Sequence, residues 1–170
     1  MADSTMLQLP VATALDGTEY TWVNQTGTDK RATTGLVAAT AASTNFSGAI
    51  EVIIDGAGMA LPTGVAAYMT VPFDCNVTGA ILLANVSGST IVDVWKCTYA
   101  QFDAGATHPV SGDSITGGNP PTITASTKSS NALTDWTTGL DSGDVLAFNV
   151  GATTTISRVT LTLNLQRVVS

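Results

Sequence analysis

The sequence has few charged residues, and basic ones are the scarcest. Its 170 residues include 6 lysines and arginines against 13 aspartates and glutamates, so the formal net charge at pH 7 is −7. A protein that binds the phosphate backbone of nucleic acids needs a clustered basic surface. The adjacent basic pair Lys30-Arg31 is too small for that, and a solvated turn end explains it better. We therefore expect no nucleic-acid partner.

Cysteine and histidine are also scarce. The two cysteines, Cys75 and Cys97, are too few for a disulfide framework, and we expect two reduced, buried thiols. The single histidine, His108, lies in a loop rich in glycine and proline. A catalytic triad would need this histidine beside a serine and a carboxylate, and the nearby Ser111 and Asp113 are ordinary for such a loop. We expect no catalytic residue, no metal site and no cofactor.

Long hydrophobic runs are missing as well. No apolar run approaches the roughly 20 residues that a helix needs to span a bilayer. The first ten residues, MADSTMLQLP, lack the basic start and the apolar stretch of a secretory signal. We therefore expect neither a membrane span nor a secretion signal.

Alternating apolar and polar residues dominate the chain from Ala49 onward. Threonine and valine are frequent, and both fit a pleated sheet better than a helix. The segment 76–97 contains the turn-like residues 85–89 and predicts an antiparallel hairpin. Other expected strands lie within 50–54, 65–73, 122–126, 145–150 and 159–165. Short strands separated by turns predict an all-β protein with a jelly-roll-like antiparallel β-sandwich.

The first 48 residues differ from the rest. Their apolar residues are small and scattered, apart from a short aromatic stretch. Strands at 19–23 and 30–34, joined by a turn at 25–29, predict a short hairpin. An isolated two-stranded hairpin is marginal in water. We therefore expect an N-terminal arm and linker over 1–48, and a β-sandwich domain over 49–170.

A long loop at 103–121 interrupts the predicted strands. It is rich in Gly, Pro, Ser and Asp, and loops of this length inside compact domains are usually functional or mobile. After it, Leu133 and Trp136 are expected to plug one end of the core. Tyr99, Phe102 and Trp136 are also candidates for stacking on sugars.

The segment 9–33, LPVATALDGTEYTWVNQTGTDKRAT, resembles a recurrent N-terminal motif of tailed-bacteriophage fibre and virion appendage proteins. The matching positions are Leu9, Pro10, Ala12, Ala14, Leu15, Gly17, Thr18, Glu19, Val23, Gln25, Gly27, Thr28, Lys30, Arg31, Ala32 and Thr33. The sequence departs from the motif at Tyr20 and Trp22, where aliphatic residues or proline are more usual. The resemblance implies attachment to a virion, with candidate attachment residues Leu9, Tyr20, Trp22, Gln25, Lys30 and Arg31.

The segment 68–168 is similar to a C-terminal β domain of phage tail-fibre and head-associated structural proteins. The stretches that carry the similarity are YMTVPFDCNVTGAILLANVSGSTIVDVWKCTYAQF, DSITG, PPTIT, LTDWTTGLDSGDVLAFNV and TISRVTLTLNLQRV. The similarity implies a β-rich and usually trimeric virion protein. It leaves open whether the protein sits on the head or on the tail.

These resemblances imply a non-enzymatic bacteriophage virion structural protein. It would be a surface-displayed short fibre or a capsid decoration (cement) protein, assembled in the host bacterial cytoplasm and anchored by its N-terminal arm. Its partners would be other virion proteins of the capsid or tail, and two further copies in a homotrimer. An alternative is a host glycan- or receptor-binding module, with Tyr99, Phe102, His108 and Trp136 facing the receptor. A polysaccharide depolymerase is a third alternative with the least support.

Overall fold

The computed structural model describes residues 18, 20–25, 28–33, 46–103 and 109–168. The chain divides into two compact units, Met1–Thr44 and Asn45–Ser170. In the second unit the first strand, β3, begins at Ser47 and pairs Ser47 with Gln166. Residues 47 and 48, assigned above to the arm, are therefore part of the sheet.

The N-terminal unit contains an antiparallel hairpin. Its strands are β1 (Tyr20–Gln25) and β2 (Thr28–Thr33), with a register that runs from Tyr20 opposite Thr33 to Gln25 opposite Thr28. The expected hairpin is present, but its two strands extend closer to the connecting turn than predicted. The predicted turn at 25–29 is wrong, because Gln25 and Thr28 already pair.

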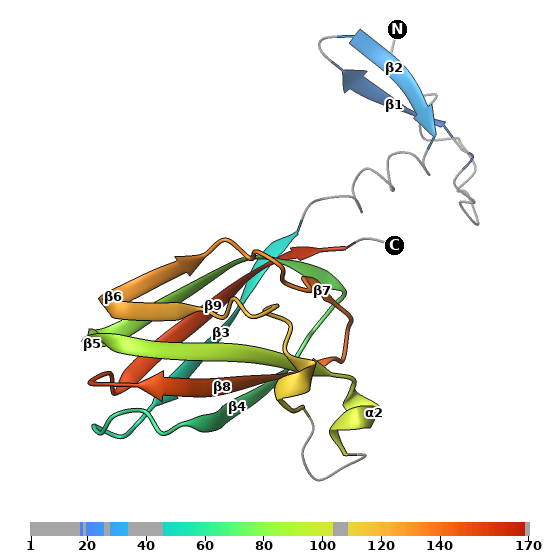
Figure 1. The fold of residues 1–170 in the computed structure, drawn as a ribbon. Coiled ribbons are helices and arrows are strands. Elements are labelled where there is room, and N and C mark those ends of the chain that lie inside the picture. The colour runs from blue at the N-terminus through green and yellow to red at the C-terminus, as the bar shows by residue number, and fades with distance from the viewer. Residues whose placement is uncertain (1–17, 19, 26–27, 34–45, 104–108, 169–170) are drawn as a thin grey trace, which may run out of the picture. The chain divides into compact units, whose positions relative to one another are not determined.

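The second unit is an antiparallel β domain with two short helices, and Figure 1 shows its arrangement. The strand order is β3-β9-β5-β8-β4, and β6 and β7 also pair with β5. The elements are β3 (Ser47–Asp55), β4 (Gly64–Thr70), β5 (Cys75–Cys97), α2 (Tyr99–Phe102), the 3-10 helix η2 (Ser111–Asp113), β6 (Thr122–Asn131), β7 (Gly139–Leu140), β8 (Val145–Thr153) and β9 (Arg158–Arg167). The prediction of an all-β, sandwich-like fold is confirmed.

Strand β5 folds this sheet into two facing layers. Its first part, 75–84, pairs with β9, and its second part, 90–97, pairs with β8. The partner β6 follows β5 through shifts of register between Leu83 and Thr90. We call β3, β9 and the first part of β5, with the β6 residues beside it, the first layer. The second layer is β4, β8 and the second part of β5. The predicted 76–97 hairpin is wrong, because 85–89 is a bend within one strand.

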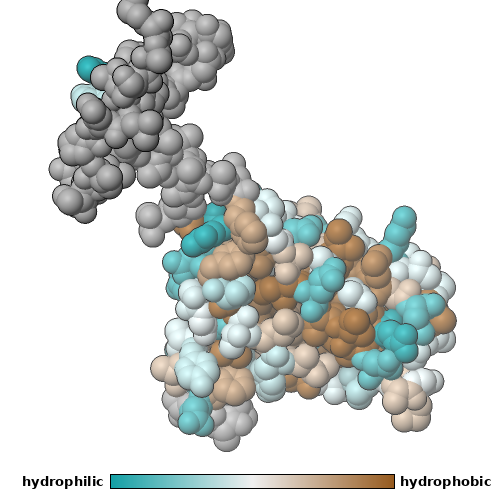
Figure 2. All heavy atoms as spheres, turned by 180° about the vertical axis from the view of Figure 1, so that it is seen from behind, coloured by the Kyte–Doolittle hydropathy of each residue, from teal (hydrophilic) through white to brown (hydrophobic). Residues whose placement is uncertain are grey.

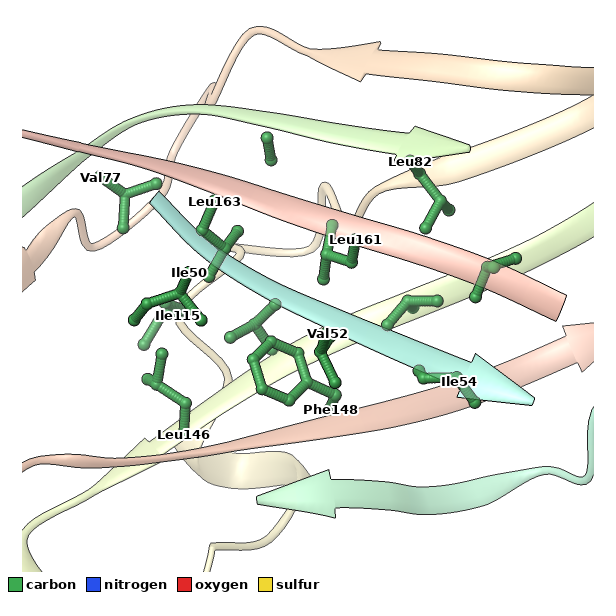
Figure 3. Packing of buried hydrophobic residues seen from close by; sticks show 14 of the residues in the cluster. Ile50, Val52, Ile54, Val77, Leu82, Ile115, Leu146, Phe148, Leu161 and Leu163 are labelled. Carbon is green, nitrogen blue, oxygen red and sulfur yellow. The ribbon is translucent and has the colours of Figure 1, made fainter. Parts of the chain in front are cut away.

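The core lies between the layers. In β3 and β9, buried residues alternate with exposed or half-buried ones, as the alternation at 50–54 and 159–165 predicted. Figure 3 shows Ile50 and Val52 from the first layer beside Leu146 and Phe148 from the second. Phe148 is the largest of the fully buried side chains of the core. Burial of these apolar faces against each other stabilises the packing of the two layers.

Candidate attachment and recognition surfaces

The N-terminal hairpin places two of the predicted attachment residues in contact. The Arg31 guanidinium carbon lies 4.1 Å from the centre of the Tyr20 ring, which is a cation–π contact. The Tyr20 side chain is 61% exposed, and Arg31 is exposed as well. The pair therefore offers an aromatic ring and a cation together on the surface.

For the other predicted attachment residues on the hairpin, the backbone pairing gives the position of each residue along the strands. The register sets Trp22 opposite Arg31 and Lys30 opposite Val23, while Gln25 pairs with Thr28 beside the turn. Leu9 lies outside the described residues. Trp22 is thus the cross-strand neighbour of the residue that stacks on Tyr20.

Two of the predicted receptor-facing residues lie on helix α2. Thr98 caps this helix: its hydroxyl accepts from the Gln101 N–H at 3.2 Å, and the Thr98 N–H donates to Gln101 Oε1 at 2.9 Å. Tyr99 is 74% exposed. Phe102 meets Tyr68 of β4 edge-to-face, with 5.0 Å between ring centres. We call Tyr68, Tyr99 and Phe102 the aromatic surface.

The sequence reasoning missed Tyr68 and misplaced Trp136. The side chain of Trp136 is only 8% exposed, and its Nε1–H donates to the Asn119 carbonyl at 2.9 Å. This agrees with its expected role in the core and removes it from the receptor-facing group. Alternation in β4 was a usable signal for Tyr68, since Ala67 and Met69 pack against the core and leave Tyr68 outside. His108 lies outside the described residues.

A carboxylate locks the segment after η2 to the sheet. Asp93 Oδ1 accepts from Ser114 Oγ at 2.9 Å, from Thr116 Oγ1 at 2.7 Å and from the Val94 N–H at 2.9 Å. Asp93 Oδ2 accepts from Trp95 Nε1 at 2.7 Å. We call these four side chains, Asp93, Trp95, Ser114 and Thr116, the Asp93 cluster. It anchors part of the predicted 103–121 loop beside β5, where Ser114 and Trp95 also form a β-bridge.

Among the residues that the structure describes, two ion pairs lie in this domain. Lys96 Nζ lies 2.9 Å from Asp144 Oδ2, and the Asp144 side chain is buried. On the surface, Arg158 Nε lies 2.7 Å from Asp55 Oδ2. The hydrogen bond from the Ala57 N–H, followed by the one from Arg158, lowers the pKa of Asp55. An exposed pair of this kind contributes little to stability.

Both cysteines are buried and free, as expected. Burial raises the pKa of each thiol, and nearby carboxylates, including Asp144 for both, raise it further. Within the described ranges, no group of three or more His, Cys, Asp or Glu residues could hold a metal ion. In the same part of the chain, no helix is both long and apolar enough to cross a membrane.

Comparisons with known proteins identify no family. No protein-family model matches the sequence, and none of the curated proteins matches it. Among solved structures, a serine protease of Aeromonas sobria has a TM-score of 0.32 and 6% sequence identity. The match covers 84% of this chain and 33% of the protease chain. A likeness this weak carries no argument about activity.

Proposed function

We propose that the protein is a non-enzymatic structural component of a bacteriophage virion. It is displayed on the particle surface as a short fibre or a capsid decoration (cement) protein, and it attaches through its N-terminal arm. The observation that carries this proposal is the division of the chain. One unit presents a hairpin with an exposed Tyr20–Arg31 pair, and the other has a hydrophobic core of its own. The resemblances at 9–33 and 68–168 support the same function.

The hairpin has the chemistry of an attachment element. Tyrosine and arginine are among the residues that most often dominate binding energy at protein interfaces. Burying the exposed Tyr20 ring against a capsid or tail protein would remove apolar surface from water and strengthen its cation–π contact. In a homotrimer the three arms would bind neighbouring sites on the particle. Because binding of one arm raises the effective concentration of the other two at their sites, the overall affinity would increase.

Incorporation into particles tests the proposal. Phage particles assembled with the full-length chain should contain it, whereas a chain lacking residues 1–33 should fold and stay out of the particles. Tyr20→Ala should lower the copy number per particle. Met59→Ala is the matched control, because Met59 is 73% exposed and belongs to the β domain. Particles that incorporate the truncated chain normally would refute arm-based attachment.

Imaging of the same particles separates the two forms of the proposal. Copies at the symmetry axes of the capsid indicate decoration, and a few copies at the tail indicate a fibre. A particle preparation from the producing host that never contains the chain would refute both forms.

The aromatic surface favours a second candidate function, recognition of a host-surface glycan. Exposed aromatic rings stack on the apolar faces of sugars, and Tyr99 and Tyr68 present such rings while Phe102 braces Tyr68. A glycan array probed with the full chain tests this. Binding should be lost in Tyr99→Ala and kept in Met59→Ala. Absence of binding to every surface glycan tested would exclude this function.

A further inference from the structure

The two outer faces of the β domain differ in how much their apolar residues are exposed. On the second layer, Ala147 lies between Trp95 and Tyr68 in neighbouring strands and is fully buried. Helix α2 reaches this side, since Phe102 packs on Tyr68. On the first layer, Ile53 is 66% exposed and Leu83 is 47% exposed. The described part of the chain therefore covers the second layer around Ala147, while Tyr68 beside it stays half exposed, and it leaves Ile53 and Leu83 exposed on the first layer.

The bare residues are neighbours across the first layer. Leu83 of β5 pairs with Thr160 of β9, and Thr160 pairs in turn with Ile53 of β3. Ile81 is two residues from Leu83 on β5, so both side chains lie on the same face of the strand. We call Ile53, Ile81 and Leu83 the apolar strip. Figure 2, seen from behind the view of Figure 1, shows apolar side chains gathered on this domain with hydrophilic ones beside them.

Opposite charges stand at the two ends of the apolar strip. Lys128 of β6 pairs with Leu83 at one edge, and a shallow depression there is lined by Lys128, Leu83 and Ile81. At the other edge Glu51 of β3 pairs with Thr162 and accepts a hydrogen bond from its hydroxyl at 3.1 Å. Besides the Asp55–Arg158 ion pair, the face thus carries a cation on β6 and an anion on β3, with Ile81 and Leu83 of β5 and Thr160 and Thr162 of β9 between them.

We propose that this face binds the same face of a second copy of the chain. The strand order across the first layer is β3, β9, β5, β6. A two-fold axis parallel to the strands and between β9 and β5 places β6 of one copy over β3 of the other. Lys128 then lies over Ile53 of the second copy and within reach of its Glu51. An interface between identical surfaces needs this self-complementary order.

The size of the face sets the strength of the pairing. Four strands about 4.8 Å apart give a face roughly 20 Å wide. The surface area that so narrow a face can bury is at the small end of the range for specific interfaces. The net charge of −7 opposes association, although salt at 0.15 M screens charges more than about 8 Å apart. Pairing is therefore weak and concentration-dependent in solution. It is independent of the attachment proposed above, because it uses the β domain and not the arm.

Sedimentation of the full-length chain tests the proposal. Between about 10 and 500 μM, where weak interfaces dissociate, the mass should rise toward twice that of the smallest species, whether that species is a monomer or a trimer. Ile81→Asp should weaken this doubling about tenfold or more, because the two-fold axis places Ile81 over Thr162 of the second copy and beside its Glu51, so the new carboxylate would be buried next to a like charge. Met59→Asp adds the same charge outside the strip and should pair like the wild type.

Charge reversal tests the orientation of the two copies. Lys128→Glu and Glu51→Lys should each weaken pairing, and the double variant, in which the charges are exchanged, should pair like the wild type. A wild-type mass that stays constant over the whole range would overturn the proposal, since another partner would then cover the face. Equal doubling in wild type and Ile81→Asp would overturn it as well. Failure of the exchange to restore pairing would overturn the two-fold arrangement.

Discussion

Asp93 shows how a single side chain can hold a long loop to a sheet. Its carboxylate accepts from Val94, Trp95, Ser114 and Thr116. Ser114 and Thr116 come from the segment that the sequence predicts only as loop, and Thr116 is buried. The sequence shows an Asp in a strand, and the distant hydroxyl groups that bind it become apparent only in the folded chain.

We predict that Asp93→Ala lowers the free energy of unfolding by about 2–3 kcal/mol, because several donors lose a charged acceptor at once. Asp103→Ala is the control, since Asp103 is exposed at the end of α2, and its effect should stay within about 0.5 kcal/mol. Urea denaturation of both variants measures this. Equal effects of the two substitutions would show that the cluster does not anchor the loop.

The buried thiols make a prediction about pH. The folded state raises the pKa of Cys75 and Cys97 above the ordinary value of 9.0, mainly through burial. The unfolded chain therefore ionises first as pH rises, and the thiols' contribution to stability is lost above about pH 9. Native protein at pH 8 should react with iodoacetamide far more slowly than protein in urea, as measured by mass spectrometry. Equal rates would contradict the buried placement.

At the element scale, regular alternation was a reliable guide and local turn signals were not. Strands β3 and β9 were predictable because buried residues alternate with exposed or half-buried ones over 50–54 and 159–165. The NVSGS stretch at 85–89 has the composition of a hairpin turn, yet it is the bend of β5. The residues that follow β8 determine this: the Ser89 N–H donates to Thr154 Oγ1, and Asn85 Nδ2 donates to Ser157 Oγ. Such contacts join residues more than 60 positions apart, so local sequence could not indicate them.

Gly88 is the residue that lets the bend and the β8–β9 connection meet. A Cβ at this position would lie 2.5 Å from Thr155 Oγ1 and 2.8 Å from Ile156 Cγ1. Neither atom can move freely, because Thr155 Oγ1 donates to the Ser87 carbonyl at 2.8 Å and Ile156 is fully buried. The glycine is required here by close packing against that connection.

We therefore predict that Gly88→Ala destabilises the protein by about 1–3 kcal/mol through overpacking. Gly112→Ala is the matched control, because nothing lies within 4 Å of a Cβ at Gly112, and its effect should stay within about 0.5 kcal/mol. Thermal unfolding followed by circular dichroism compares the two. If Gly88→Ala unfolds at the wild-type temperature, the connection does not pack tightly into the bend.

At the scale of the whole molecule, the candidate sites were harder to predict than the fold. Tyr99 was a candidate for the receptor-facing group because it is an aromatic residue beside the long loop, and it is exposed. The role of Trp136 was ambiguous, because tryptophan occurs both in cores and on sugar-binding surfaces. Only its burial and its hydrogen bond to the Asn119 carbonyl assign it to the core. The apolar strip depends on which of the two outer faces the rest of the chain covers, and no pattern within a single strand contains that information.

The division into two units leads to a prediction for the whole chain. Every buried residue of the hydrophobic core cluster lies between Ile50 and Leu165, and the described strands of the N-terminal unit contribute none. A chain lacking residues 1–33 should therefore unfold cooperatively within a few degrees of the full-length melting temperature. Its near-ultraviolet circular dichroism should keep the signal of Trp95 and Trp136, which both belong to the β domain. A large drop in melting temperature would mean that the arm is part of the β domain's stability, and that its exposed Tyr20–Arg31 pair serves the fold as well as attachment.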